Sequence, residues 1–139
     1  MFKRIVIASD GSEGAVRALS AAIRLARQHQ ATLDLVSVVE TPQAPASVDE
    51  MAKVESALRQ FYEAIARGAI LQAQAGGVQL TTHLFTGRAV KAIVDFIKRE
   101  RADLLAVGCF GHSAAYEHII GKTTDRLVEL APCAVLVVK

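Results

Sequence analysis

The chain opens with an apolar segment that runs into a turn, FKRIVIASDGS at residues 2–12. The centre of this segment, Ile5-Val6-Ile7, is β-branched and therefore favours a strand. Asp10-Gly11-Ser12 follows it, a group of residues typical of turns and of helix caps. After the turn, Val16, Leu19 and Ile23 are spaced by three and four residues, which predicts an amphipathic helix. The segment therefore predicts a strand, a turn and a helix, in that order.

The rest of the chain alternates between strand and helix patterns in the same way. Helices are predicted between the loop 40–47 and Gly76-Gly77, after Gly87, and from about Thr124 to Leu130. Apolar runs predict strands at residues 33–39, 79–86, 104–108 and 134–138, of which 79–86 is diluted by polar residues and suits a sheet edge. The order βαβαβαβαβ requires right-handed crossovers, and therefore a parallel sheet with helices on both faces.

Length and composition indicate one soluble domain. The 139 residues fall in the usual size range of a single domain, and no internal repeat or change in composition divides residues 1–139. Hydrophobic residues make up 52% of the chain and charged residues 22%, which excludes a disordered or collagen-like protein. Apolar runs fall well short of the roughly 18 residues of a membrane helix, and the run after Lys3-Arg4 is too short for a signal peptide. Two cysteines fit a reducing compartment, so we expect a cytoplasmic protein without a membrane partner.

Charge and aromatic content argue against a nucleic-acid partner. The formal net charge is +2, from 16 basic and 14 acidic residues, and no long basic run is present. Aromatic residues make up 5% of the chain and tryptophan is absent, so stacking surfaces for single strands are scarce.

Three glycines near the fourth predicted strand have the chemistry of a phosphate site. Gly108 and Gly111 permit close approach of backbone to a ligand, and Gly121 precedes Lys122-Thr123-Thr124 at the start of a helix. Free amides from Gly121 to Thr124, together with the helix dipole, favour an anion such as a di- or triphosphate. Ligands of parallel sheets bind beyond the carboxyl ends of the strands where the strand order reverses, so Asp10 and Gly108 are expected to face each other there.

Two better-known phosphate motifs do not fit these residues. A Walker A loop needs glycine at position 116, where this chain has Tyr116, and should follow its strand directly. The first strand is followed by Asp10-Gly11-Ser12-Glu13-Gly14, which is not the dinucleotide pattern GxGxxG. A P-loop NTPase and a dinucleotide enzyme are therefore not expected.

From Lys3 to Val138 the sequence resembles the universal stress protein (UspA-like) family. The resemblance is carried by the opening IVIASDGS at 5–12, the Gly87 turn, Ala102-Asp103-Leu104-Leu105 and the close APCAVLVV at 131–138. Its most specific feature is the spacing G-x2-G-x9-G of the family's nucleotide-binding branch, present as Gly108, Gly111 and Gly121.

The resemblance implies a three-layer α/β/α fold, Rossmann-like and similar to adenine nucleotide alpha hydrolases, with a five-stranded parallel sheet of order 3-2-1-4-5. It further implies ATP as the ligand, a homodimer formed through Ala134–Val138, and a regulatory role in the stress response. Carried over by position, Ala8, Ser9 and Asp10 would border adenine and ribose, with Val38 against the adenine. Val107 and Gly108 would lie under the ribose and phosphates, and Gly111, Gly121, Thr123 and Thr124 would form the phosphate cradle.

Lys122 departs from the family pattern, which has serine or threonine directly after its third glycine. Its ammonium can neutralise phosphate, and its backbone amide is unaffected by the change. Magnesium or manganese would be bound mainly through the phosphates. His112 and His118 have only Glu117 near them at ligand spacing, so no metal site made of side chains is expected.

Several alternatives remain open at this stage. Asp10, three residues before Glu13, has the spacing of a capping box and could cap a helix, bind ligand or do both. Cys109 is expected to be an inert small hydrophobe, with a redox-sensitive thiol near the helix-end amides as the alternative. Cys133 is expected to be buried packing, and His29 and His83 are expected at the surface. The first hypothesis is a module in which bound ATP sets the conformation of loops 109–122 and 40–47. The others are a slow ATP hydrolase, for which Glu117 and His118 are the only loop candidates as base, and a stress interaction protein without nucleotide.

Overall fold

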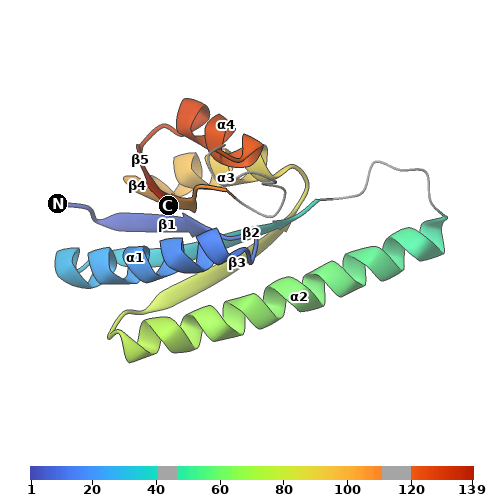
Figure 1. The fold of residues 1–139 in the computed structure, drawn as a ribbon, viewed down its shortest axis with the longest axis horizontal. Coiled ribbons are helices and arrows are strands. Elements are labelled where there is room, and N and C mark those ends of the chain that lie inside the picture. The colour runs from blue at the N-terminus through green and yellow to red at the C-terminus, as the bar shows by residue number, and fades with distance from the viewer. Residues whose placement is uncertain (41–46, 111–119) are drawn as a thin grey trace.

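The computed structural model describes residues 1–40, 47–110 and 120–139. They form a five-stranded parallel sheet of order β3-β2-β1-β4-β5 (Figure 1). The predicted α/β class, strand order and edge position of residues 79–86 are confirmed. The elements are β1 (Arg4–Ala8), α1 (Glu13–His29), β2 (Thr32–Val39), α2 (Val48–Ala75), β3 (Leu80–Thr86), α3 (Ala89–Glu100), β4 (Leu104–Gly108), α4 (Lys122–Leu130) and β5 (Ala134–Val138).

The helices cover both faces of the sheet, which gives three layers (Figure 1). Side chains alternate between the two faces of a strand, so Ile5 and Ile7 of β1 pack against α1 and α2 while Val6 faces α3 and α4. On the first face the helices present small residues such as Ala22 and Ala73, whereas Phe96 of α3 fills the second face. The central strands are buried on both faces, as a parallel sheet requires.

The start of α1 is capped by Ser12. The Ser12 hydroxyl accepts a hydrogen bond from the Ala15 amide at 3.2 Å, and Asp10 Oδ1 accepts one from the Ser12 amide at 2.9 Å. Asp10 therefore shapes the turn before the cap, and the capping-box interpretation of Asp10 is wrong. The periodic residue Val16 is 56% exposed, because the contact face of α1 is made by its alanines, Leu19 and Ile23.

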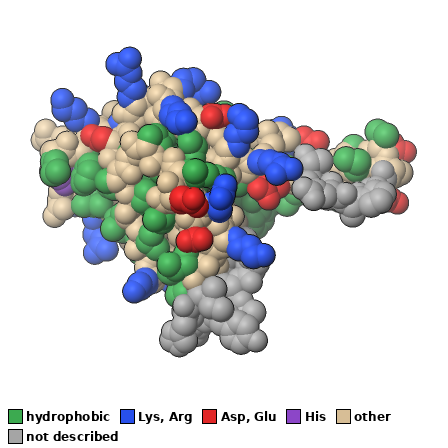
Figure 2. Space-filling view, turned by 90° about the horizontal axis from the view of Figure 1, so that it is seen from above, with side chains coloured by type: hydrophobic (Ala, Val, Ile, Leu, Met, Phe, Trp, Pro, Cys, Tyr) green, Lys and Arg blue, Asp and Glu red, His purple; other side chains and the backbone are tan. Residues whose placement is uncertain are grey.

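Helix α2 extends well past the sheet, and its first turns stand clear of the body (Figures 1 and 2). A helix of 28 residues is about 42 Å long at 1.5 Å per residue, whereas the neighbouring β3 has 7 residues. Only Ala69 and Ala73 of α2 are buried, and the periodic residues Val54 and Phe61 are 42% and 45% exposed. The apolar pattern predicted the helix correctly, but its length leaves half of that face outside the core.

A buried carboxylate lies near the amino end of β2, on the α3 side of the sheet. The Asp34 side chain is 4% exposed and contacts Arg4 Nε at 2.9 Å and His83 Nε2 at 2.8 Å. Arg4 continues the cluster to Glu100 of α3, Nη1 to Oε2 at 3.1 Å. His83 also packs on Phe96, with ring centroids 4.6 Å apart, so the expected surface position of His83 is corrected to a partly buried, paired one. The signal missed in the sequence was an aspartate inside an apolar strand.

We expect Asp34→Ala to lower the free energy of unfolding by about 2–3 kcal/mol, because Arg4 and His83 would lose a buried partner while staying partly solvated. Urea denaturation measures the change. Asp95→Ala removes a carboxylate that pairs with Lys91 on the exposed side of α3, and should leave the unfolding midpoint unchanged. Equal midpoints for the two variants would contradict a structural role for Asp34.

Candidate functional site

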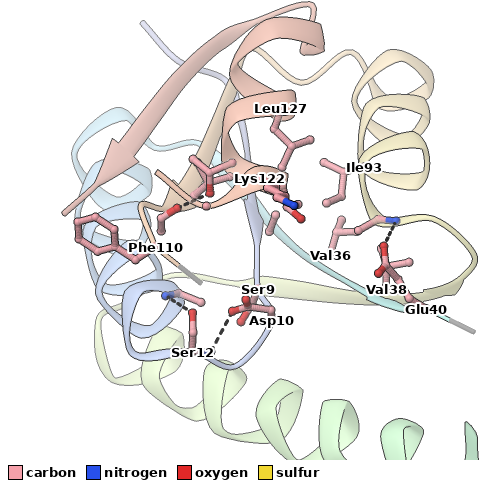
Figure 3. Close-up of a pocket in the computed structure, with 18 of the residues that line it drawn as sticks. Ser9, Asp10, Ser12, Val36, Val38, Glu40, Ile93, Phe110, Lys122 and Leu127 are labelled. Atoms are coloured by element: carbon pink, nitrogen blue, oxygen red, sulfur yellow. Dashed lines mark hydrogen bonds between the residues drawn. The ribbon is translucent and has the colours of Figure 1, made fainter. Parts of the chain in front are cut away.

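A cavity of about 390 Å³ opens at the carboxyl ends of the strands, where β1 lies between β2 and β4 (Figure 3). The chain leaves β1 toward α1 on one face of the sheet, and it leaves β4 toward α4 on the other face. The strand order therefore reverses between β1 and β4. Strand ends form its floor, α4 and the start of α3 contribute from one layer, and α2 contributes from the opposite layer. The cavity is therefore where a ligand of this fold class is expected.

Most of the predicted site residues meet in this cavity. They come from parts of the chain that are more than 100 residues apart, and parallel strand pairing brings them together. Gly111, His112, Glu117 and His118 lie outside the described residues. The predicted residues that line the cavity are Ala8, Ser9, Asp10, Val38, Val107, Gly108, Gly121, Lys122, Thr123 and Thr124.

The loop after β1 is held in place by hydrogen bonds. The Ser37 hydroxyl donates to the Ser9 carbonyl at 2.9 Å, and the Ser9 amide donates to the Val36 carbonyl at 3.0 Å. Ser9 Oγ in turn accepts from the Gly11 amide at 3.2 Å. These contacts fix the loop that carries Asp10 into the cavity lining, as Figure 3 shows.

Gly108 is required by packing as much as by any ligand. A Cβ on Gly108 would lie 2.5 Å from the carbonyl carbon of Gly14 and 2.8 Å from the Ala15 nitrogen. These are backbone atoms of the first turn of α1 and cannot move aside as a flexible side chain would. Gly108 therefore lets α1 lie directly on the end of β4.

The backbone amide of Gly121, which the sequence predicted to be free for phosphate, is already hydrogen-bonded. Its N–H donates to the Cys109 carbonyl at 2.9 Å, and a Cβ here would lie 3.0 Å from the Phe110 carbonyl oxygen. The free amides therefore begin one residue later than expected. Those of Lys122, Thr123 and Thr124 form the first turn of α4, where no intrahelical acceptor is within reach.

The two threonines at the start of α4 have different roles. Thr124 is buried, and its hydroxyl donates to the Gly108 carbonyl at 2.7 Å, so its proton ties α4 to β4. Thr123 and Lys122 are exposed at the cavity. Among the described residues no side chain caps this helix, so they leave the positive end of the α4 dipole available to an anion. In the described part of the chain, no group of three or more histidine, cysteine or acidic residues could hold a metal ion.

Ten of the 20 lining residues were not predicted from the sequence, among them Glu40, Leu58, Tyr62 and Ile93. Glu40 directly follows β2, and its Oε1 accepts a hydrogen bond from the Ala89 amide at the start of α3 at 2.9 Å. Leu58 and Tyr62 come from α2, and Ile93 from α3. Helix spacing identified the contact faces of α2 and α3, but which turn of each helix reaches the cavity depends on how the helix lies on the sheet.

Burial and charge both act on Tyr62. Partial burial raises the pKa of its phenol, and the carboxylates of Asp10 and Glu40 raise that pKa further. The phenol is therefore neutral over the physiological range.

The two cysteines differ in burial. Cys109 is 2% exposed, and its amide donates to the Val138 carbonyl at 3.0 Å, which agrees with the expected inert packing role. Cys133 is only partly buried, less than expected, and desolvation raises the pKa of its thiol. Neither thiol belongs to the cavity lining.

Comparison with known proteins gives a consistent result over the whole chain. Residues 1–139 match the universal stress protein family. A universal stress protein of Thermus aquaticus is 33% identical over 139 residues, covering 100% of both chains. The structure of the universal stress protein UspA from Lactobacillus plantarum matches with a TM-score of 0.92 at 24% identity, covering 99% of this chain and 98% of that one.

Two further structural matches contain nucleotides. A universal stress protein in complex with cAMP has a TM-score of 0.75 at 24% identity, covering 99% of this chain and 97% of that one. One from Archaeoglobus fulgidus in complex with dAMP has a TM-score of 0.69 at 20% identity, with coverages of 99% and 98%.

Within the described ranges of this chain, no helix is long and apolar enough to cross a membrane.

We expect Gly108→Ala to lower the free energy of unfolding by at least about 2 kcal/mol, because its Cβ would overlap the backbone of α1. Gly68→Ala is the matched control, since Gly68 lies within α2 with nothing within 4 Å of its Cβ position. That change should raise the stability by about 0.5–1 kcal/mol through better helix propensity. Chemical denaturation of both variants checks the pair, and a harmless Gly108→Ala would contradict the close contact.

Proposed function

The chain belongs to the universal stress protein family, and from this premise we propose that it binds ATP in the cavity at the carboxyl ends of β1, β2 and β4. The observation that carries the proposal is the arrangement of the lining. Apolar side chains, a carboxylate and an uncapped helix start share one cavity of about 390 Å³, a size typical of small-ligand sites.

Each part of a nucleotide has a chemical match in this lining. Val38 and Ile93 offer apolar contact for a flat base. The Asp10 carboxylate accepts hydrogen bonds, which suits the hydroxyl groups of a ribose. The first turn of α4, with the Lys122 ammonium and the Thr123 hydroxyl, suits the phosphates.

Magnesium or manganese would accompany ATP through the phosphate oxygens. The side chains at the start of α4 supply an ammonium and hydroxyls, and the hydroxyl proton of Thr124 is already donated to Gly108. These groups do not form a metal site of their own, so the protein's contribution there is charge neutralisation by Lys122 and the helix amides.

We further propose that nucleotide occupancy regulates the chain through the two connections whose described end residues line the cavity. Residues 41–46 and 111–119 of these connections lie outside the described residues. Glu40, Phe110 and Gly121 at their ends are all part of the cavity lining. A bound ligand would therefore contact the fixed ends of both connections, which supports a nucleotide-dependent regulator in the stress response.

The last strand supports a homodimer. In the described residues β5 has a neighbour on one side only, and its side chains from Val135 to Val138 are apolar and partly exposed. Val138 directs its carbonyl to β4, so Val135 and Val137 direct theirs, with their N–H groups, to the open edge. Pairing with the same strand of a second copy would satisfy these groups and cover an aggregation-prone edge.

The first test is nucleotide content and affinity. Protein purified without added ligand is denatured and assayed for adenine nucleotide, and ATP binding is then measured by calorimetry. Gly121→Val should weaken ATP binding at least ~10-fold, because the new side chain would press on the Phe110 carbonyl and displace the start of α4. Gly77→Ala, at a turn remote from the cavity, is the control for general damage. Absence of nucleotide, together with no ATP binding by the unmodified protein, would exclude the proposed function.

The second test concerns the β5 edge. Val137→Pro removes an outward N–H while keeping an extended backbone, so it should turn a dimer into a monomer without breaking the pairing of β5 with β4. Val137→Thr keeps the N–H and should remain dimeric. Size-exclusion chromatography with light scattering measures the mass. A dimer that survives Val137→Pro would place the interface elsewhere.

A further inference from the structure

The charged side chains of the cavity are unevenly distributed over its walls. Among the described lining residues the charged ones are Asp10, Glu40 and Lys122. Lys122 lies on α4 beside the positive end of that helix, whereas Asp10 and Glu40 follow β1 and β2. Figure 3 shows the three residues on separate sides of the cavity. A ligand in this space therefore meets positive potential at α4 and negative potential at the ends of β1 and β2.

The Glu40 carboxylate is held in position. Its Oε1 accepts the hydrogen bond from the Ala89 amide at 2.9 Å, and Ala89 is the first residue of α3. Arg88, the residue at the N-cap position of α3, makes no capping hydrogen bond with its own side chain. The contact satisfies one of the orphan amides of α3 and fixes the direction of the carboxylate at the cavity edge.

Tyr62 is likewise fixed, although α2 is largely exposed. Its ring packs edge-on against Phe61, with centroids 5.3 Å apart and planes at 69°. Phe61 and Ile65 in turn lie against Gly11, where a Cβ would come within 2.9 Å of Phe61 and 2.5 Å of Ile65. Gly11 has φ +79°, so only a residue without a Cβ fits this contact comfortably. The turn that carries Asp10 and the helix that carries Tyr62 are thus packed together.

The raised pKa of Tyr62 agrees with a negative potential in this part of the cavity. Burial is the largest cause of the raised pKa. The next causes are the carboxylates of Asp10 and Glu40, whose charges disfavour a third negative charge on the phenol. A phosphate placed among these groups would meet the same opposition, whereas hydroxyl or amino groups would find acceptors.

We propose that Glu40 and Tyr62 make the cavity selective for the position of the phosphate on the nucleotide. The favoured ligands are nucleoside 5′-phosphates with free 2′ and 3′ hydroxyls, and the disfavoured ones carry phosphate at the 2′ or 3′ position. Glu40, exposed at the edge of the cavity, extends the negative charge beyond Asp10, and Tyr62 lines the cavity close to both carboxylates. This inference rests on the proposed nucleotide function and adds to it the class of nucleotide that is excluded.

The decisive comparison uses AMP and 3′-AMP, isomers that differ only in the position of the phosphate. For the unmodified protein at low salt we expect calorimetry to give AMP at least a ~10-fold higher affinity, and we expect the ratio to shrink at 0.5 M salt as charges are screened. Equal affinities for the isomers would overturn the selectivity while leaving nucleotide binding intact. A ratio that is insensitive to salt would overturn the electrostatic cause. Failure of both AMP and ATP to bind would instead overturn the proposed function.

Two substitutions assign the effect to residues. Glu40→Gln keeps an oxygen for the Ala89 amide but removes the charge, so the affinity ratio should fall at least ~3-fold, through tighter binding of 3′-AMP. Glu63→Gln is the matched control: it makes the same charge change beside Tyr62 on α2, outside the cavity, and should leave the ratio unchanged. Tyr62→Ala opens the wall and should lower the ratio as well. Thermal melting confirms that each variant is folded, and an unchanged ratio in folded Glu40→Gln would overturn the assignment.

Discussion

The fold depends on a close backbone contact between the end of β4 and the first turn of α1. Gly108 and Gly14 meet there without side chains between them, and a Cβ on Gly108 would come within 2.5 Å of Gly14. Because α1 follows β1, this contact also constrains how far β4 extends alongside β1, its neighbour in the sheet. The cavity lies at the same place, since the two connections leave the sheet on opposite faces.

The same contact organises the polar groups of the site. Thr124 donates to the Gly108 carbonyl, so the start of α4 is placed relative to the end of β4. Ser12, which caps α1, and Asp10, which shapes the turn before it, follow the end of β1. Backbone packing thus brings a carboxylate and an uncapped helix start into one cavity. On the first turn of α4, for example, Thr124 bonds to Gly108 whereas Lys122 and Thr123 line the cavity.

Helix α2 contributes to the site from the opposite layer. Its buried anchor is small, Ala69 and Ala73, and much of its first half is exposed. Near the cavity it is supported by Phe61 and Ile65 against Gly11. The helix is therefore anchored in the core near its carboxyl end and packs near its middle against the turn that contains Asp10. A ligand that contacts Leu58 or Tyr62 would therefore contact the part of α2 that lies next to this support.

The sequence by itself determined the order of elements, the parallel sheet and half of the cavity lining. β-branched runs, helical spacing and turn residues are local signals, and parallel pairing then forces strand ends such as Ala8 and Val107 together. Only the tertiary structure decided that Ser12 rather than Asp10 caps α1, that the Gly121 amide is already bonded, that His83 pairs with buried Asp34, and that Glu40 and Tyr62 reach the cavity. The Ser12 cap is a local hydrogen bond that depends on the exact turn geometry, and the other outcomes depend on distances between segments separated in the chain, which spacing along one element does not contain.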